Sequence, residues 1–284
     1  MKESGKMVID FRVRPPYGVY AEKMFQNLDA REDFANKYGF TSPPSVIQCD
    51  MDLFIQELDK AGIDLAVIPG RGAMGTKNEE LLEIAETYKG RFVVFPFVNP
   101  MEGQGALKDL EKLAEKESVK GFSMEPGVAI NGRTFDFDDE IAFPFYEKMQ
   151  ELGLPLMITY SGHTVPEMDS RYVAKLDRVA VQFPNLNIVL SHAGWPWVME
   201  LIGMAFRRKN IYLLPDVYGT NSPGSGEFTV AANTLIPDKI LFGSAYPIIP
   251  VVEAVQFYEK EAGYREDVLE KVMGGNASKL LGLQ

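Results

Sequence analysis

Eight short runs rich in β-branched and aromatic residues recur along this chain, and segments with the apolar period of helices separate them. The runs are Met7–Val13, Leu65–Pro69, Phe92–Val98, Val119–Met124, Leu156–Tyr160, Asn187–Ser191, Ile211–Leu214 and Ile240–Gly243. Strands that alternate with helices form parallel sheets, and eight such units can close into a ring. The order therefore predicts an α/β fold, a single (β/α)8 TIM barrel.

The gap after the first run departs from this spacing. Residues 15–50 are too many for an ordinary loop and are rich in aromatic side chains. Loops after the strands form the active face of such barrels, so we expect this insertion to fold over the barrel mouth, as a lid, a dimer contact or a helical extension packed on the rim. Because no linker or repeat interrupts the remainder, residues 1–284 are predicted to form one domain, with the glycine-rich segment 219–226 as a candidate gate.

Charge and composition exclude several classes of protein. A net charge of −11 repels phosphate backbones and anionic membranes, so nucleic acid is not an expected partner. No apolar stretch approaches the ~20 residues that cross a bilayer, and the first residues lack the pattern of a secretory signal. The single cysteine, Cys49, cannot form an internal disulfide, in keeping with a reducing compartment. We therefore expect a cytoplasmic protein without membrane contact.

Residues of functional type follow most of the runs, where the ends of barrel strands converge on one pocket. They include three arginines, carboxylates and both histidines of the chain. In chain order they are Arg12, Arg14, Arg71, Asn99, Glu125, Tyr160, His163, His192, Asp216 and Tyr246. The sequence therefore predicts one polar site at one end of the barrel.

Arg12 and Arg14 lie two positions apart on the first run, so we expect them to project to the same side of a strand. Guanidinium groups pair with carboxylates through two parallel hydrogen bonds, which makes an arginine-lined pocket an anion site. Arg71 is predicted to join them. In the alternative interpretation, Glu125 and Asp216 pair with Arg12 and Arg14 for structural reasons alone, and Arg71 is exposed on a loop.

Four segments carry a resemblance to a known family. They are 8–16 (VIDFRVRPP), 190–194 (LSHAG), 240–247 (ILFGSAYP) and 275–283 (GNASKLLGL). In order and spacing they resemble the amidohydrolase-related family, which includes aminocarboxymuconate-semialdehyde decarboxylase, aromatic-acid decarboxylases and lactone hydrolases. The resemblance spans the chain from the first strand to the last helix, and it implies a TIM-barrel enzyme that forms a homodimer.

Metal-binding members of that family hold zinc or manganese with a His-x-His pair on the first strand, one histidine after the fifth strand, another after the sixth and an aspartate after the eighth. In this sequence Arg12 and Arg14 stand at the first pair, Tyr160 near the next position and Ala245 at the aspartate, so that only His192 matches. One imidazole cannot hold a catalytic zinc. The resemblance therefore implies the scaffold without its metal, and no cofactor is predicted.

A relocated metal site is the alternative. Glu125, His163, His192 and Asp216 are ligands of a suitable kind. The neighbouring arginines would repel a divalent cation, so a metal is disfavoured.

His192 is the predicted acid–base residue, because it directly follows a buried run and imidazole exchanges protons near neutral pH. Asp216 or Glu125 would assist it, while the other residues of the site would bind a small anionic substrate. The leading hypothesis is a metal-independent hydrolase that cleaves an ester, lactone or C–C bond in a carboxylated or enolic substrate. A decarboxylase (lyase) acting on an aromatic or unsaturated acid is one alternative, and a non-catalytic anion-binding pseudoenzyme is another.

Overall fold

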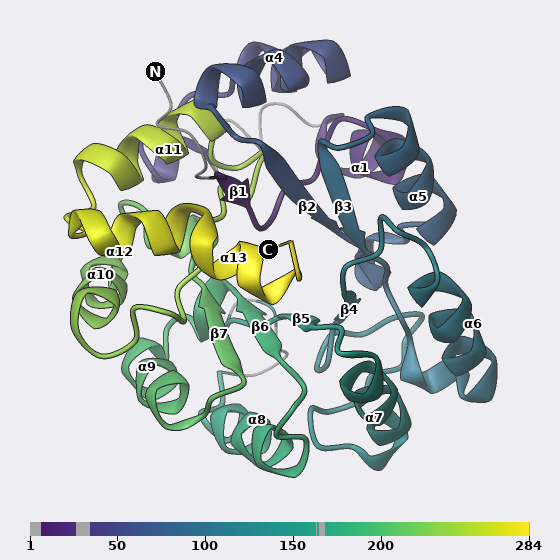
Figure 1. Ribbon diagram of the computed structural model, residues 1–284. Coiled ribbons are helices and arrows are strands. Elements are labelled where there is room, and N and C mark those ends of the chain that lie inside the picture. The colour runs from purple at the N-terminus through teal and green to yellow at the C-terminus, as the bar shows by residue number, and fades with distance from the viewer. Residues whose placement is uncertain (1–6, 27–34, 163, 165–167, 284) are drawn as a thin grey trace.

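Parallel strands form the centre of the molecule, and helices surround them (Figure 1). This computed structural model describes residues 7–26, 35–162, 164 and 168–283. The strands pair in the orders β1-β2-β3 and β4-β5-β6-β7, every neighbouring pair being parallel. Their bounds are β1 Ile9–Asp10, β2 Leu65–Pro69, β3 Phe92–Phe95, β4 Phe122–Met124, β5 Leu156–Thr159, β6 Ile188–Ser191 and β7 Ile211–Leu214.

Isolated parallel bridges join these two sheets into a closed barrel. On one side they link β3 and the residues after it to the segment 119–123, and on the other the segment 240–246 lies between β7 and the residues that follow β1. The bridges are Val94–Val119, Phe97–Ser123, Leu213–Ile240 and Val13–Tyr246. The eighth apolar run thus takes its predicted place, and the (β/α)8 barrel is confirmed. The assignment of residues 1–284 to one domain stays a prediction.

The first run is shorter as a regular strand than the sequence predicts. β1 ends at Asp10, and the chain bends at Phe11. The ring of Phe11 packs edge-on against Phe95, with the centroids 5.6 Å apart, and both belong to a cluster of fully buried apolar residues. Regular strand alternation therefore does not extend to Arg12 and Arg14, whose side chains are placed by their own contacts.

Amphipathic helices cover the barrel, each with its apolar side against the strands. In α4, for example, Phe54 and Leu58 are fully buried, Asp50 accepts a hydrogen bond from the N–H of Leu53 at the helix start, and Gly62 ends the helix at φ 72°. The longer helices are α4 Met51–Ala61, α5 Asn78–Thr87, α6 Gln104–Ala114, α7 Phe143–Leu152, α8 Arg171–Gln182, α9 Val198–Arg207, α10 Ser225–Thr234 and α11 Val251–Lys260, and the short α12 Glu266–Glu270 and α13 Asn276–Leu280 follow. None of the helices in the described ranges has the length and apolarity to cross a membrane.

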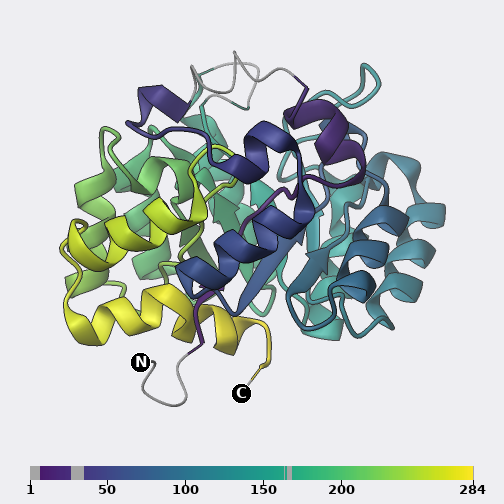
Figure 2. The same ribbon diagram turned by 90° about the horizontal axis from the view of Figure 1, so that it is seen from above.

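The insertion after the first run contributes α1 (Gly18–Met24) and α3 (Pro44–Gln48). Figure 2 shows α1, in purple, at the end of the barrel opposite the yellow C-terminal helix α13. The hydroxyl of Tyr20 in α1 donates to the carbonyl of Pro69, the last residue of β2. Tyr38 packs edge-on against Tyr218, which follows β7. These described parts of the insertion therefore contact the ends of the strands where the predicted site lies.

Candidate active site

Arg12 occupies the centre of the site, and its guanidinium is fully buried. Its Nη1 donates to Asp216 Oδ2 at 2.8 Å and also contacts His192 Nε2 at 3.2 Å. Its Nε and Nη2 are buried and have no hydrogen-bond partner among the residues that the structure describes. Burial lowers the pKa of Arg12, and the charge of Asp216 opposes that shift. Two donors of a buried cation are thus left for an anion to satisfy.

His192 directly follows β6 and begins the 3-10 turn η4 (His192–Gly194). Its Nδ1 lies 2.8 Å from Asp216 Oδ1, and Asp216 begins the turn η5 (Asp216–Gly219) after β7. Because a guanidinium can only donate, Nε2 must accept from Arg12, which leaves the ring proton on Nδ1 to be donated to Asp216.

Electrostatics keep this pair as a neutral imidazole and a carboxylate. Burial lowers the pKa of His192 to about 4; Asp216 opposes this shift, while Arg12 and Arg14 add to it. Burial alone would raise the pKa of Asp216, but its contacts with His192 and Arg12 hold that pKa below its usual range. At neutral pH His192 therefore carries no charge in the absence of a ligand.

Arg14 is bound to the backbone that follows the eighth run. Its Nε donates to the carbonyl of Tyr246 at 3.1 Å, and its Nη2 donates to the carbonyl of Ala245. Burial lowers the pKa of Arg14 well below its usual value, and the positive charges of Arg12 and Arg71 lower it further. These like charges repel one another, so an anion bound between them would stabilise the folded state.

Arg71 lies on the loop after β2 and is held by Glu125, which directly follows β4. Its Nε donates to Glu125 Oε1, while Glu125 Oε2 accepts from the N–H of Ala73 at 2.8 Å. The side chain of Arg71 is 13% exposed and that of Glu125 is 1% exposed. Glu125 thus fixes the arginine loop, and the carboxylate that contacts His192 is Asp216.

Strained backbone marks the ends of three strands around these side chains. His192 has φ 67°, Asp216 has φ 44° and Ala245 has φ 54°, all in the left-handed region that residues with a Cβ avoid. Each such residue costs of order 1–3 kcal/mol, and residues of this kind concentrate at functional sites. Two of these residues, His192 and Asp216, are the ones whose side chains contact Arg12.

Gly194 is expected to be essential for this arrangement. It has φ 67°, and a Cβ added there would lie 2.8 Å from Leu201 Cγ and 3.2 Å from Tyr160 Cε1. We expect Gly194→Ala to lower the free energy of unfolding by ~1–3 kcal/mol, through overpacking and backbone strain, as measured by urea denaturation. Gly203→Ala is the control, because Gly203 is exposed in α9 with open space around it, and it should stabilise slightly. Equal stability of the two variants would contradict the close packing at Gly194.

Two groups that the sequence did not single out complete the site. Asp10 is fully buried, and its Oδ1 accepts from the N–H groups of Arg12 and Ser244 at 3.0 Å each. Burial raises the pKa of Asp10 to about 6. The ring of Tyr218 packs edge-on against His192, with centroids 5.5 Å apart, and stacks on Trp195 at 4.7 Å. Tyr218 could have been predicted from the sequence, because it lies two residues after Asp216. Asp10 gave no such indication, since it has the place of an ordinary strand residue.

The remaining predicted site residues are placed differently. Asn99 caps the turn η2 (Pro100–Glu102), accepting from Met101 and donating to Glu102. The hydroxyl of Tyr246 lies 2.7 Å from Ser45 Oγ in α3, and its ring stacks on Phe54, so its described contacts fasten the insertion to the barrel.

Tyr160 stacks on Trp197 with the ring centroids 5.8 Å apart, and burial raises the pKa of its hydroxyl. That hydroxyl is buried without a hydrogen-bond partner in the described ranges. His163 lies outside the described residues. The substrate-binding assignments of Asn99, Tyr160, His163 and Tyr246 stay predictions.

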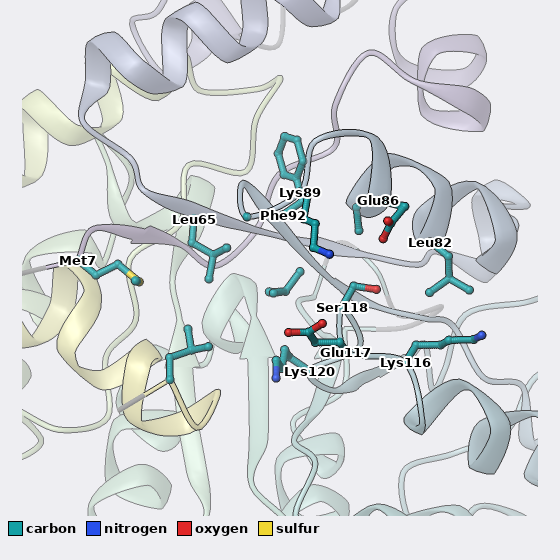
Figure 3. Close-up of a pocket in the computed structure, with 14 residues that line it drawn as sticks. Met7, Leu65, Leu82, Glu86, Lys89, Phe92, Lys116, Glu117, Ser118 and Lys120 are labelled. Carbon is teal, nitrogen blue, oxygen red and sulfur yellow. The ribbon is translucent and has the colours of Figure 1, made fainter.

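A cleft of about 510 Å³ lies at the opposite end of the barrel, beside Leu65 and Phe92, the first residues of β2 and β3 (Figure 3). Figure 3 shows lysine and glutamate side chains interspersed with apolar ones such as Met7, Leu65 and Leu82 around this cleft. In such barrels the catalytic groups lie at the carboxyl ends of the strands, and the other end contributes to stability. The buried cluster around Arg12 is therefore the candidate active site.

Comparisons with known proteins agree with this fold. The sequence profile described as amidohydrolase matches residues 46–283. An uncharacterised TIM-barrel protein from Bordetella bronchiseptica shares 31% sequence identity, with a TM-score of 0.88 over 97% of this chain and 98% of that chain. The comparison with curated proteins found no match.

Two decarboxylases share the fold at lower identity. A 5-carboxyvanillate decarboxylase from Sphingomonas paucimobilis is 19% identical, with a TM-score of 0.64 over 99% of each chain. A dihydroxybenzoic acid decarboxylase from Polaromonas is 16% identical, with a TM-score of 0.67 over 99% of this chain and 98% of that chain, and its structure contains manganese and the inhibitor 2-nitroresorcinol. At these identities the likeness shows the fold alone.

The prediction that no cofactor is bound is wrong. Structures of decarboxylases that share the barrel contain manganese. Within the part of this chain that the structure describes, no three His, Cys, Asp or Glu side chains are grouped to hold a metal ion. Beside His192 and Asp216 the guanidinium of Arg12 contacts both side chains, so this donor set does not fit a divalent cation.

Proposed function

The chain belongs to the amidohydrolase family, and on that premise we propose that it is an enzyme acting on a small carboxylated or enolic substrate. Arg12, Arg14 and Arg71 bind the anionic group of that substrate, and His192 moves the proton. One observation carries the proposal: two nitrogen atoms of the buried Arg12, Nε and Nη2, lack partners among the described residues, directly beside His192 and Asp216. Leaving a buried donor unsatisfied costs ~1–3 kcal/mol, which a carboxylate would offset.

Substrate binding also prepares His192 for proton transfer. The positive charges of Arg12 and Arg14 help to keep its pKa low. A carboxylate that pairs with these arginines offsets their charge and so raises the pKa of His192 toward its ordinary range. For Nε2 to take a proton, Arg12 Nη1 must turn from it to the bound anion. Asp216 then accepts from Nδ1 and stabilises the imidazolium that forms. Acid–base chemistry is therefore coupled to the presence of the anion.

Hydrolysis of an ester, lactone or C–C bond is the reaction that we place first. Each of these reactions passes through an oxyanion or enolate, which the buried arginines would stabilise. Decarboxylation is the second candidate, favoured by the decarboxylases that share the fold. In that reaction the arginines would hold an acidic group of the substrate and His192 would deliver the proton. The homodimer and the cytoplasmic location implied above stay predictions.

The proposal is tested with a panel of small acids, esters and lactones that includes 2,6-dihydroxybenzoate and 5-carboxyvanillate. Binding is measured by calorimetry and turnover by product analysis, each with and without added manganese. Release of carbon dioxide identifies a decarboxylase, and an acid product from an ester or lactone identifies a hydrolase. Binding without turnover of any member would favour the non-catalytic pseudoenzyme.

Arg14→Met is expected to weaken binding of the tightest acid in this panel by ~2–5 kcal/mol, because it removes one buried charge-assisted pair. A ligand with a Kd of about 1 μM would then bind with a Kd of roughly 30 μM to 5 mM. The control is Arg178→Met, since Arg178 is exposed and pairs with Asp138 at the surface. Unchanged affinity in Arg14→Met would show that this arginine serves the fold and not the ligand.

A further inference from the structure

We propose that Tyr20, which α1 brings to the site from the insertion, is a further substrate-binding residue whose hydroxyl donates a hydrogen bond to the bound anion. The inference rests on the proposed anion binding by the arginines, and it holds for either hydrolysis or decarboxylation. It assigns to residues 15–50 a direct part in the site, through one side chain.

The position of Tyr20 supports this role. The residue is 3% exposed, and its hydroxyl donates to the carbonyl of Pro69 at the end of β2. Arg71 follows two residues later on the same loop. The phenol oxygen therefore lies at the buried end of the strands, beside the loop that carries one of the three arginines.

The charges of the three arginines all lower the pKa of this one hydroxyl. Burial raises the pKa of Tyr20 to about 12, while the positive charges of Arg71, Arg14 and Arg12 oppose that rise. Tyr20 is in turn among the groups that raise the pKa values of Arg12 and Arg14. The hydroxyl consequently keeps its proton at neutral pH, and from its place at the end of β2 it can act as a donor to an anion that these arginines hold.

Contacts that do not involve the hydroxyl fix α1 in place. The N–H of Val19 donates to Glu80 Oε2 in α5 at 2.9 Å. Gly18 has φ 51°, and a Cβ added there would lie 2.4 Å from the same oxygen, so the helix start is closely fitted against Glu80. Removing only the hydroxyl of Tyr20 should therefore leave the ring and the helix where they are.

The bond from the Tyr20 hydroxyl to Pro69 is one that a bound anion could replace. Rotation about its C–O bond redirects the proton from the neutral carbonyl of Pro69 to a carboxylate. A charged acceptor makes a bond roughly twice as strong as a neutral one, so the anion is the preferred partner. The competing interpretation is that Tyr20 only fastens the insertion to β2.

Tyr20→Phe separates these two roles, with Tyr146→Phe as the matched control. Tyr146 is also fully buried, and its hydroxyl donates to the carbonyl of Phe137 at 3.0 Å in another part of the barrel. Both variants lose one buried bond from a phenol to a carbonyl. We expect Tyr20→Phe to weaken binding of the tightest acid of the panel by ~10- to 100-fold, and Tyr146→Phe to leave that affinity unchanged.

Thermal unfolding of the ligand-free variants shows how much each lost bond contributes to the fold. If Tyr20→Phe binds the acid as the wild type does, while Arg14→Met has lost it, the Tyr20 proposal is overturned and the anion site stands. If Arg14→Met also binds normally, the proposed function fails first. Should Tyr20→Phe not fold, a crystal structure of the wild type with the acid decides: a carboxylate oxygen within hydrogen-bond distance of Tyr20 Oη supports the proposal, and a greater separation overturns it.

Discussion

Replacing Arg12 with methionine is expected to abolish anion binding and to destabilise the protein at the same time. The substitution removes the two unused donors and also leaves Asp216 as a buried carboxylate without its cation. Breaking a buried ion pair by removing one partner costs ~3–5 kcal/mol. Urea denaturation should show that loss in the free energy of unfolding, and calorimetry should show no binding of the panel's tightest acid.

Arg12→Lys provides the control for charge. An ammonium keeps the positive charge but lacks the planar fork that reaches Asp216 and a ligand together, so stability should recover in part and affinity should not. A methionine variant that remains as stable as the wild type and binds the acid would contradict the central place given to Arg12.

Replacing His192 with asparagine is expected to lower turnover by ~100-fold or more, the scale on which a positioned acid or base contributes. Asparagine tolerates the left-handed backbone that His192 adopts, and its amide can still donate toward Asp216. Arg12 keeps its bond to Asp216, so the affinity for the acid should change little. The measurement is kcat and Kd on the same substrate, and full activity of this variant would remove His192 from the mechanism.

The sequence predicted which residues come together better than it predicted what each one contacts. The fold follows from the spacing of apolar runs, and the gathering of Arg12, Arg14 and His192 follows from their places after strand ends. The partners of Arg12 could not be read from spacing, because Asp216 and His192 reach it only through left-handed backbone at their own positions.

Glu125 shows a second limit of the sequence pattern. It follows β4 directly, as a catalytic carboxylate would, yet in the structure it accepts from Arg71 and from the N–H of Ala73. Asn99 likewise follows a strand but caps a turn. A position after a strand end brings a residue to the correct end of the barrel, whereas local hydrogen bonds decide whether it points into the site or holds a loop.

The cofactor prediction was wrong for a different reason. It was drawn from the loss of ligand positions in one chain, whereas structures of other proteins with the same barrel contain manganese. The contacts of Arg12 with His192 and Asp216 describe the arrangement of three side chains. They do not show whether proteins with this fold bind a metal.

At the seam where the last barrel segment of the chain meets the first, the contacts are made by Arg14, a residue of the candidate site. There the N–H of Arg14 donates to the carbonyl of Tyr246 at 3.0 Å, and the guanidinium of the same residue donates to Tyr246 and Ala245. The same residue therefore closes the barrel through its backbone and places a positive charge at the site through its side chain. We expect a ligand that pairs with Arg14 to change how tightly the seam is held, so amide hydrogen exchange along residues 11–14 should differ between the free and the occupied protein.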